Sequence, residues 1–457
     1  MELNDEHLNF SELRPQNGYT ELLENHNGQV VSFEQTLNFS NYANWTIETM
    51  FNIDAKKKIS ILILLNPNID LFTGVFQYNF ESSISFGGIF RIIILVYLVI
   101  DLLIRFYVKE RIRFKRSFIL YSILFLGFSL IFGIRSLNQF GVLVSFKQVT
   151  YLIRYLSFPV YLITLASYIE EVDTHSILKL FSQSATIYSA LVVLPFISNT
   201  GFDSYAMEGL SGSVGWFVGA NEIGMIIGMT MMSNLVIFKE NRTRDFYTII
   251  QEFLPLVALL IIGTKAALVF FVLYVLTLLV RTYRNTSFRS KLPLLILMII
   301  LMIITGLFTP AVQNLLYVVS ISNPNQVLTI LLSGRLTFLK RTFSNYLDAS
   351  VISKIFGLGF MTINNKGFLL GDKLVEMDIF DILFRTGVVG LVVVFSPMVR
   401  LLRSFIKDEN KKINWVIINT VILSTIFGFL IGHVFSAPSV SIFMSVYVLM
   451  IFYNRTI

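Results

Sequence analysis

The sequence predicts an all-α fold, that of a polytopic membrane protein with about twelve transmembrane helices and one large extracellular loop. Of the 457 residues, 54% are hydrophobic and 14% are charged, whereas soluble domains carry roughly 25% charged residues. The mean hydropathy is +0.70. Apolar segments of about 20 residues, the length that crosses a bilayer as a helix, recur along the chain.

Composition excludes several kinds of site. The chain contains no cysteine, so it forms neither a disulfide nor a cysteine-based metal site, and its four histidines are too few for a histidine-rich centre. The net charge of +7 could suggest nucleic acid, but the cations lie beside the ends of apolar segments. That placement is typical of membrane-protein loops. We therefore expect no nucleic-acid partner.

Residues 1–57 are interpreted as a polar cytoplasmic N-terminal extension. They lack the basic start, apolar middle and small-residue cleavage site of a signal peptide, and they show no sustained helical stripe. An alternative is that translation begins at Met50, because the basic run Lys56–Lys58 follows it closely, as in an ordinary membrane-protein start.

Residues 58–310 are predicted to form transmembrane helices 1–9, and residues 378–457 to form helices 10–12. The expected spans are 58–76, 88–107, 117–133, 147–168, 176–197, 216–238, 247–263, 265–281, 292–310, 378–402, 413–432 and 437–453. Lys147 and Arg154 interrupt the fourth span. Only the turn 263–265 separates the seventh span from the eighth, which predicts a tight helical hairpin.

Charge placement gives the topology. The expected cytoplasmic loops carry clusters of cations, at Lys56–Lys58, 109–116, 239–244, 281–291 and 403–412. Only the loop 169–175, which holds three acids, departs from the positive-inside pattern. The pattern predicts a multi-pass protein of the cell membrane with both termini in the cytoplasm. It places residues 311–377 outside, as the large loop.

Within that loop, residues 336–347 predict an amphipathic helix. Leu336, Leu339, Phe343 and Leu347 fall on one face at helical spacing. Such a helix could rest on the outer surface of the bilayer with this face down, or it could pack on the ends of other helices. Both interpretations stay open at this point.

Four cations stand where charge is costly or where the loop begins, and they are candidates for binding an anionic headgroup such as a pyrophosphate. Arg154 lies inside the fourth span, Lys265 at the hairpin tip, Arg335 at the start of the basic loop segment and Arg385 inside the tenth span. The guanidinium fork suits phosphate oxygens, and lysine adds a point charge. Arg91, near the end of the second span, is expected to snorkel to the interface.

Acidic and polar candidates accompany these cations. Glu376 and Asp378 stand at the outer mouth of the tenth span, and His433 at the outer end of the eleventh. Each could serve as a general base. Asn221, among glycines in the sixth span, favours helix packing with substrate contact as a secondary role. Arg385 could instead form an ion pair with Asp381 or Asp378, one turn away.

The same acids bear on the question of a metal. Glu376 and Asp378 could in principle ligate magnesium or manganese. Because arginine and lysine are available to neutralise a leaving group, we expect a metal-independent site and no cofactor.

Several short segments together resemble one family. They are the glycine-rich segment 215–224, the turn 263–265, Ser333-Gly334-Arg335, Phe356-Gly357-Leu358-Gly359, Glu376-Met377-Asp378 with 387–390, and Gly432-His433. In order and topology they resemble the O-antigen polymerase and ligase superfamily, most of all the Wzy-type polysaccharide repeat-unit polymerases of Gram-positive bacteria. Two positions depart from that pattern. Lys265 stands where the family commonly has arginine, and Glu376 stands where the ligase branch often has histidine, which favours the polymerase branch.

The resemblance implies a glycosyltransferase that joins undecaprenyl-pyrophosphate-linked oligosaccharide units into capsular or exopolysaccharide polymer at the outer face of the membrane. The implied roles are pyrophosphate binding by Arg154, Lys265 and Arg335, and proton transfer by Glu376, Asp378 or His433. A flippase and a chain-length regulator are the expected protein partners. One alternative is a ligase that moves finished polymer to an acceptor. A second is a polysaccharide-lipid transporter, although a loop of about 65 residues is longer than ordinary connections and counts against it.

Overall fold

The computed structural model describes the chain in segments. The described residues are 22–24, 30–32, 54–80, 86–107, 116–169, 171–205, 211–237, 246–284, 310, 313–314, 316, 335–363, 369–371, 375–407, 415–430, 432 and 434–453. The chain divides into two units, Met1–Asp54 and Ala55–Ile457. In the first unit, β1 (Leu22–Glu24) and β2 (Val30–Ser32) form an antiparallel pair with Leu23 opposite Val31. The expected start at Met50 lies outside the described residues.

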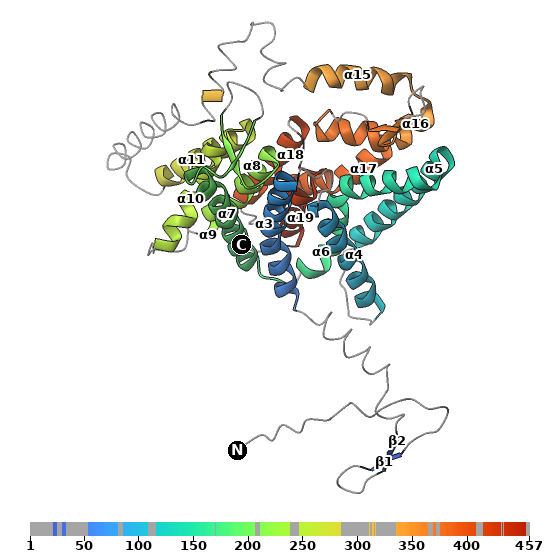
Figure 1. Ribbon diagram of the computed structural model, residues 1–457, viewed down its shortest axis with the longest axis horizontal. Helices are drawn as coiled ribbons and strands as arrows, with labels where there is room; N and C mark the ends of the chain where they lie inside the picture. Colours follow the sequence, from blue (N-terminus) through green and yellow to red (C-terminus); the bar gives the residue numbers. More distant parts are fainter. Residues whose placement is uncertain are drawn as a thin grey trace. The chain divides into compact units, whose positions relative to one another are not determined.

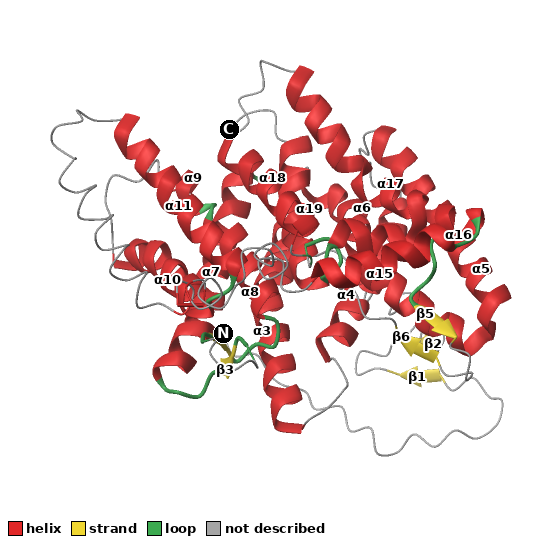
Figure 2. Cartoon of the chain, turned by 90° about the horizontal axis from the view of Figure 1, so that it is seen from above, coloured by secondary structure: helices red, strands yellow, loops and turns green. Residues whose placement is uncertain are grey.

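The second unit is built mainly of helices, as Figures 1 and 2 show. Its helices are α3 (Ala55–Phe80), α4 (Phe86–Tyr107), α5 (Arg116–Tyr155), α6 (Ser157–Ile169), α7 (Thr174–Ile197), α8 (Ala220–Met231), α9 (Asn234–Ile237), α10 (Phe246–Ile262), α11 (Lys265–Arg284), α15 (Arg335–Asp348), α16 (Val351–Phe356), α17 (Asp378–Lys407), α18 (Trp415–Leu430) and α19 (Pro438–Tyr453). Two short hairpins accompany them, β3 (Phe202–Asp203) with β4 (Ser213–Gly215), and β5 (Met361–Ile363) with β6 (Leu369–Gly371).

Six of the described helical segments are long and apolar enough to cross a membrane, and five shorter helices are also apolar. The protein is therefore a multi-pass membrane protein, as expected. The structure differs from the expected spans at two places. Residues 147–155 continue the 40-residue helix α5 and begin no new span, and the segment 216–238 becomes helical only at Ala220. The expected span 292–310 lies outside the described residues.

Two ion pairs fix the register of the antiparallel helices α3 and α4. Lys58 Nζ lies 2.8 Å from Asp101 Oδ1 near one end of the pair, and Arg91 contacts Asp70 near the other. The two contacts are separated by about 15 to 18 Å along the helix axes. All four side chains are almost excluded from solvent. Because an unpaired charge is costly inside a membrane protein, the two pairs oppose any shift of one helix along the other. The sequence-based expectation that Arg91 snorkels to the interface is therefore wrong, because Arg91 is paired with Asp70 between the helices.

Hydrogen bonds between small polar side chains and neighbouring helices hold the centre of the bundle together. Ser157 Oγ on α6 lies 2.8 Å from Ser441 Oγ on α19, and Ser445 Oγ donates to the Phe158 carbonyl at 3.1 Å. Such contacts are the usual means of joining helices that share an apolar environment. On α8, Gly224 lies against Thr264 and Ala267, so the packing role expected for the glycines of this segment is observed.

The predicted amphipathic helix is present as α15, which packs on α17 (Figure 1). The rings of Tyr346 and Phe384 have centroids 5.3 Å apart, and Tyr346 is buried. On the face predicted from the sequence, Phe343 and Leu347 remain 42% and 53% exposed. The helix therefore packs on another helix through Tyr346 and still presents apolar side chains outward.

Candidate functional site

Asp378, the first residue of α17, fastens the segment that joins α18 to α19. Its carboxylate accepts hydrogen bonds from the backbone N–H groups of Val434 and Phe435 at 2.7 and 2.8 Å, and from the Ser436 hydroxyl at 2.5 Å. Asp378 is 1% exposed. A buried carboxylate that accepts several donors is well compensated for its desolvation. Asp378 thus holds the backbone that directly follows position 433.

Asp381, one turn later, shapes the backbone that leads into α17. Its carboxylate accepts from the N–H groups of Val375, Glu376 and Met377 at 2.9, 2.8 and 3.2 Å. These three residues directly precede α17 and donate to a side chain of its first turn. Glu376 adopts a positive φ of 63°, a conformation that is uncommon for residues other than glycine. The Asp381 hydrogen bonds hold this turn and so fix the direction of the Glu376 side chain.

Glu376 forms an ion pair with Arg335, the first residue of α15. Arg335 Nη2 lies 3.0 Å from Glu376 Oε2. The two partners differ in exposure, because the Arg335 side chain is 7% exposed and that of Glu376 is 45% exposed. The Nε of Arg335 has no hydrogen-bond partner among the described residues. The pair thus combines an almost buried guanidinium with a carboxylate that solvent can reach.

Two further side chains lie within electrostatic range of Arg335. One is Lys265, half-buried at the start of α11, and the other is Tyr205, which follows β3. The Tyr205 hydroxyl donates to the Gly263 carbonyl at 3.3 Å, so it contacts the turn between α10 and α11. Burial raises the pKa of Tyr205, and the nearby Arg335 charge opposes this shift. The predicted hairpin turn thereby brings Lys265 toward Arg335.

Arg385 is almost buried and holds the turn that follows α16. Its Nη1 donates to the Gly359 carbonyl at 3.2 Å, while the Gly359 N–H donates back to the Arg385 carbonyl at 3.1 Å. The same turn is held from α5, because Arg135 Nη1 donates to the Gly357 carbonyl at 2.8 Å and Gln148 Oε1 accepts from Phe360 N–H at 2.7 Å. These contacts give Arg385 a role in fixing the turn.

A cavity of about 520 Å³ lies between α3, α4, α5, α8 and the start of α19. Arg154, Arg91, Asp70 and Glu222 are among the residues that line it. Arg154 is exposed, whereas the Arg91–Asp70 pair is almost closed to solvent and also receives the Tyr188 hydroxyl, which donates to Asp70 Oδ2 at 2.6 Å. The cavity therefore has charged groups of both signs on its wall.

The cavity and the Arg335–Glu376 pair are connected through the segment 432–439. At one end of the segment Asp378 holds residues 434–436, and at the other end Ser439 Oγ donates to Glu222 Oε2 at 2.9 Å. Gly432 lies against the Glu376 carbonyl in a left-handed conformation, where an added Cβ would collide with the backbone. The backbone of this segment therefore passes directly beside Glu376 and reaches the cavity wall.

Comparison with known protein families gives an extensive match. The model of the family described as O-antigen ligase like membrane protein matches residues 54–328 and 322–454. The chain belongs to this family. Comparison with curated proteins and with solved structures gave no match. The match covers the helical unit that holds both the ion pair and the cavity.

In this O-antigen ligase like membrane protein, the residues expected to form the site fall into two groups. Glu376 pairs with Arg335 near the start of α17, where Asp378 and Asp381 hold the backbone, and Lys265 lies within electrostatic range of Arg335. Arg154 lines the cavity instead, and Asn221, half-buried at the second position of α8, is not among the residues that line it. His433 lies outside the described residues.

The sequence reasoning missed Asp70 and Glu222 as cavity residues and Tyr205 as a neighbour of Arg335. Asp70 could have been found, because it is a charge within the first predicted span and such charges are candidates by default. Glu222 directly follows Asn221, in the glycine-rich segment for which the sequence favoured helix packing. Nothing in the sequence near Tyr205 indicates that it lies close to Arg335, which is far away in the chain.

The described residues contain no group of three or more acidic or histidine side chains arranged to hold a metal ion. The carboxylates of Asp378 and Asp381 are occupied by backbone and hydroxyl donors. A metal-independent site remains a prediction from the sequence.

Proposed function

We propose that this protein is a membrane glycosyltransferase that joins undecaprenyl-pyrophosphate-linked oligosaccharide units into a surface polysaccharide at the outer face of the cell membrane. Family membership supports a membrane enzyme that acts on lipid-linked polysaccharide. The observation that carries the proposal is the arrangement of Arg335, Lys265 and the exposed carboxylate of Glu376 around a fixed backbone.

The two cations suit the leaving group. Arg335 offers a planar fork with one donor, Nε, that has no partner within the described chain, and Lys265 adds a second positive charge nearby. Two like charges held close together are electrostatically unfavourable alone and become favourable when an anion lies between them. A pyrophosphate has the charge and the number of oxygen acceptors that this arrangement requires. We propose that Arg335 and Lys265 bind the donor pyrophosphate.

Glu376 is the proposed general base. The Glu376 carboxylate is bound to the Arg335 guanidinium. An incoming pyrophosphate would therefore compete with Glu376 for that guanidinium. Binding of the donor would thereby release the carboxylate, which is 45% exposed and can turn toward an acceptor hydroxyl. Release of the base would then depend on the presence of the donor, which would limit side reactions.

The chemical step follows from these roles. A hydroxyl oxygen of the acceptor sugar attacks the anomeric carbon of the donor, and its proton passes to the Glu376 carboxylate. The bond between the anomeric carbon and the phosphate oxygen breaks, and undecaprenyl pyrophosphate leaves with its negative charge balanced by Arg335 and Lys265. Asp378 would act as a positioning residue for the segment that contains His433, the weaker candidate for proton transfer.

The cavity supplies space for a second substrate. Its volume of about 520 Å³ is in the range of pockets that hold small ligands, and its wall carries the exposed Arg154 and the carboxylate of Glu222. A polymerase must hold two lipid-linked glycans at once. We assign Arg154 to the second of them, Asn221 to a secondary contact with substrate, and Arg385 to support of the turn at Gly359. A flippase and a chain-length regulator remain the proposed protein partners.

The test is polymer length in cells that carry single variants. Arg335→Gln and Glu376→Gln should leave the protein in the membrane and abolish long polymer. Lys340→Gln, an exposed cation on the same helix α15, is the matched control and should give normal polymer. Normal chain length in both site variants would refute the assignment.

The family description favours a second candidate, a ligase that transfers finished polymer to an acceptor. A deletion strain distinguishes the two activities. Loss of a polymerase leaves single repeat units, whereas loss of a ligase leaves polymer attached to the lipid carrier. Analysis of the lipid-linked fraction by gel therefore decides between them.

A further inference from the structure

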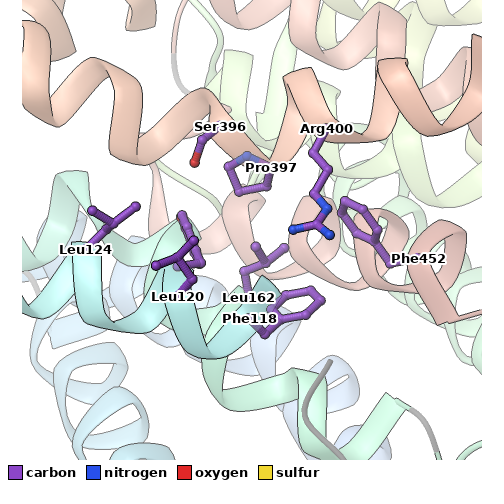
Figure 3. Close-up of a pocket in the computed structure, with 9 residues that line it drawn as sticks. Phe118, Leu120, Leu124, Leu162, Ser396, Pro397, Arg400 and Phe452 are labelled. Carbon is purple, nitrogen blue, oxygen red and sulfur yellow. The ribbon is translucent and has the colours of Figure 1, made fainter. Parts of the chain in front are cut away.

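A second groove, separate from the candidate site, lies between α5, α6, α17 and α19 (Figure 3). Its volume is about 160 Å³, and its lining is mostly apolar, with Phe118, Leu120, Leu124, Leu162 and Phe452 among the lining residues. Arg400 is the one charged residue that lines it. Arg400 lies beyond the kink of α17 at Gly387, whereas Asp378 begins the helix. The residues that line the groove are therefore separate from the Arg335–Glu376 pair and from the cavity.

Arg400 extends into the groove. Figure 3 shows its side chain reaching from α17 toward Leu162 and Phe118, past Pro397. Within the described chain no hydrogen bond or ion pair of Arg400 is found. Arg400 is exposed, so its guanidinium is open to solvent or to an anion that approaches the groove. The groove therefore offers one uncompensated positive charge.

Tyr121 provides an independent observation in the same groove. Its side chain lines the groove and is 7% exposed, and its hydroxyl has no hydrogen-bond partner among the described residues. Buried hydroxyl groups are normally hydrogen-bonded, so an unpaired one indicates a missing acceptor. Tyr121 and Arg400 are both donors. A ligand that satisfies both must bring acceptor oxygens, while its remaining surface must be apolar to match the lining.

We propose that this groove binds one anionic membrane phospholipid. Its phosphate accepts from Arg400, an ester or phosphate oxygen accepts from the Tyr121 hydroxyl, and one acyl chain covers Phe118, Leu120 and Leu124. Charge complementarity favours an anionic lipid, because the sequence that follows Arg400 carries further cations at Arg403, Lys407, Lys411 and Lys412. Basic residues at one end of a membrane helix attract anionic lipids.

The experiment is a lipid titration of the purified full-length protein in detergent, followed by native mass spectrometry. The probes are phosphatidylglycerol, phosphatidylcholine of the same acyl composition, and undecaprenyl phosphate. Wild-type protein should bind its first phosphatidylglycerol more tightly than its first phosphatidylcholine. Arg400→Gln should lower the affinity for the first phosphatidylglycerol by about fivefold, as expected for one basic group near a lipid phosphate. Tyr121→Phe, which removes a single oxygen atom, should weaken it by a similar or smaller factor.

Matched controls separate the groove from general charge effects. Arg341→Gln removes an exposed cation from α15, and Tyr107→Phe removes an exposed hydroxyl from the end of α4, so both should bind phosphatidylglycerol as wild type does. A single symmetric peak in size-exclusion chromatography verifies that each variant is folded. Equal binding of the two phospholipids by wild type, or unchanged binding by both groove variants, would overturn the proposal. Preferential binding of undecaprenyl phosphate that is lost in Arg400→Gln would also overturn it, because the occupant would then be a polyprenyl lipid.

Discussion

Two of the arginine–carboxylate pairs among the described residues, Arg91–Asp70 and Arg335–Glu376, are alike in chemistry and different in surroundings. In the Arg91–Asp70 pair the side chains are 10% and 13% exposed, and the second oxygen of Asp70 is taken by the Tyr188 hydroxyl. In the Arg335–Glu376 pair the arginine is equally buried, but the carboxylate is 45% exposed. The two acids thus differ in the access of solvent and in the additional hydroxyl partner of Asp70.

That difference suits the Arg91–Asp70 pair to a structural role and the Arg335–Glu376 pair to the proposed chemical role. Breaking a buried pair leaves an uncompensated charge and is strongly destabilising, so Arg91 and Asp70 are suited to fixing α3 against α4 and α7. An exposed carboxylate can leave its partner and be solvated by water, so Glu376 can exchange Arg335 for a substrate anion. The comparison predicts opposite outcomes when the two pairs are broken.

The largest effect on stability is expected for Arg91→Met. Loss of the guanidinium leaves Asp70 buried beside the Tyr188 hydroxyl alone, which should cost about 3–5 kcal/mol and reduce the folded yield of the protein in the membrane. The double variant Arg91→Met, Asp70→Asn removes both charges and should recover much of that yield. Fluorescence-detected size-exclusion chromatography measures both. Should Arg91→Met be folded but produce no polymer, the buried pair would belong to the substrate site and the comparison would fail.

The second-largest effect is expected on activity, in a variant that remains folded. Exchanging the charges in the double variant Arg335→Glu, Glu376→Arg allows an ion pair of opposite orientation at the same place. Stability should change by about 1 kcal/mol or less, because one partner is exposed. Activity should nonetheless fall by about 10²–10³-fold, because a carboxylate would now face the leaving pyrophosphate. The measurements are the thermal midpoint and the polymer yield. Restored polymer would show that only the ion pair matters, not the identity of its members.

The sequence predicted those parts of the molecule that depend on local pattern. The lengths of the apolar segments predicted the positions of seven helices to within a few residues: α3, α4, α7, α10, α11, α18 and α19. The spacing of apolar residues predicted the position of α15. The turn at Gly263 was evident because two apolar segments met there with only a short polar interruption. These signals are contained in a few consecutive residues.

The parts that the sequence did not predict depend on contacts between distant segments. Glu376 and Asp378 are two residues apart and looked equivalent as acids. Their partners come from Arg335 on one side and from residues 434–436 on the other, and these partners give one acid an exposed position and the other a buried one. Likewise, Lys147 and Arg154 suggested an interrupted span, whereas α5 continues without a break to Tyr155.

Asp378→Asn tests the distinction between these two acids. An amide oxygen replaces a carboxylate that accepts three hydrogen bonds, and the amide NH₂ group would face the donors at 434–436. We expect a loss of about 1–3 kcal/mol in stability, measured as a lower thermal midpoint. Ser436→Ala removes one of the three hydrogen bonds and should cost about 1 kcal/mol. Glu376→Gln should leave the midpoint unchanged. An Asp378→Asn protein as stable as wild type but inactive would instead place Asp378 in contact with substrate.

Tyr205→Phe should have the smallest effect on activity. It tests whether the phenol near the Arg335–Glu376 pair transfers a proton. Burial raises the pKa of Tyr205 and the Arg335 charge only partly opposes this, so the phenol stays protonated from about pH 6 to about 9. The variant loses one long hydrogen bond, at 3.3 Å to the Gly263 carbonyl, which contributes about 1 kcal/mol or less. We expect an activity loss of less than about tenfold. The pH profile should keep its shape, since the phenol takes no part in the proposed proton transfer. Loss of the basic limb of that profile in Tyr205→Phe would show that the phenol transfers a proton, and the role of Glu376 would have to be revised.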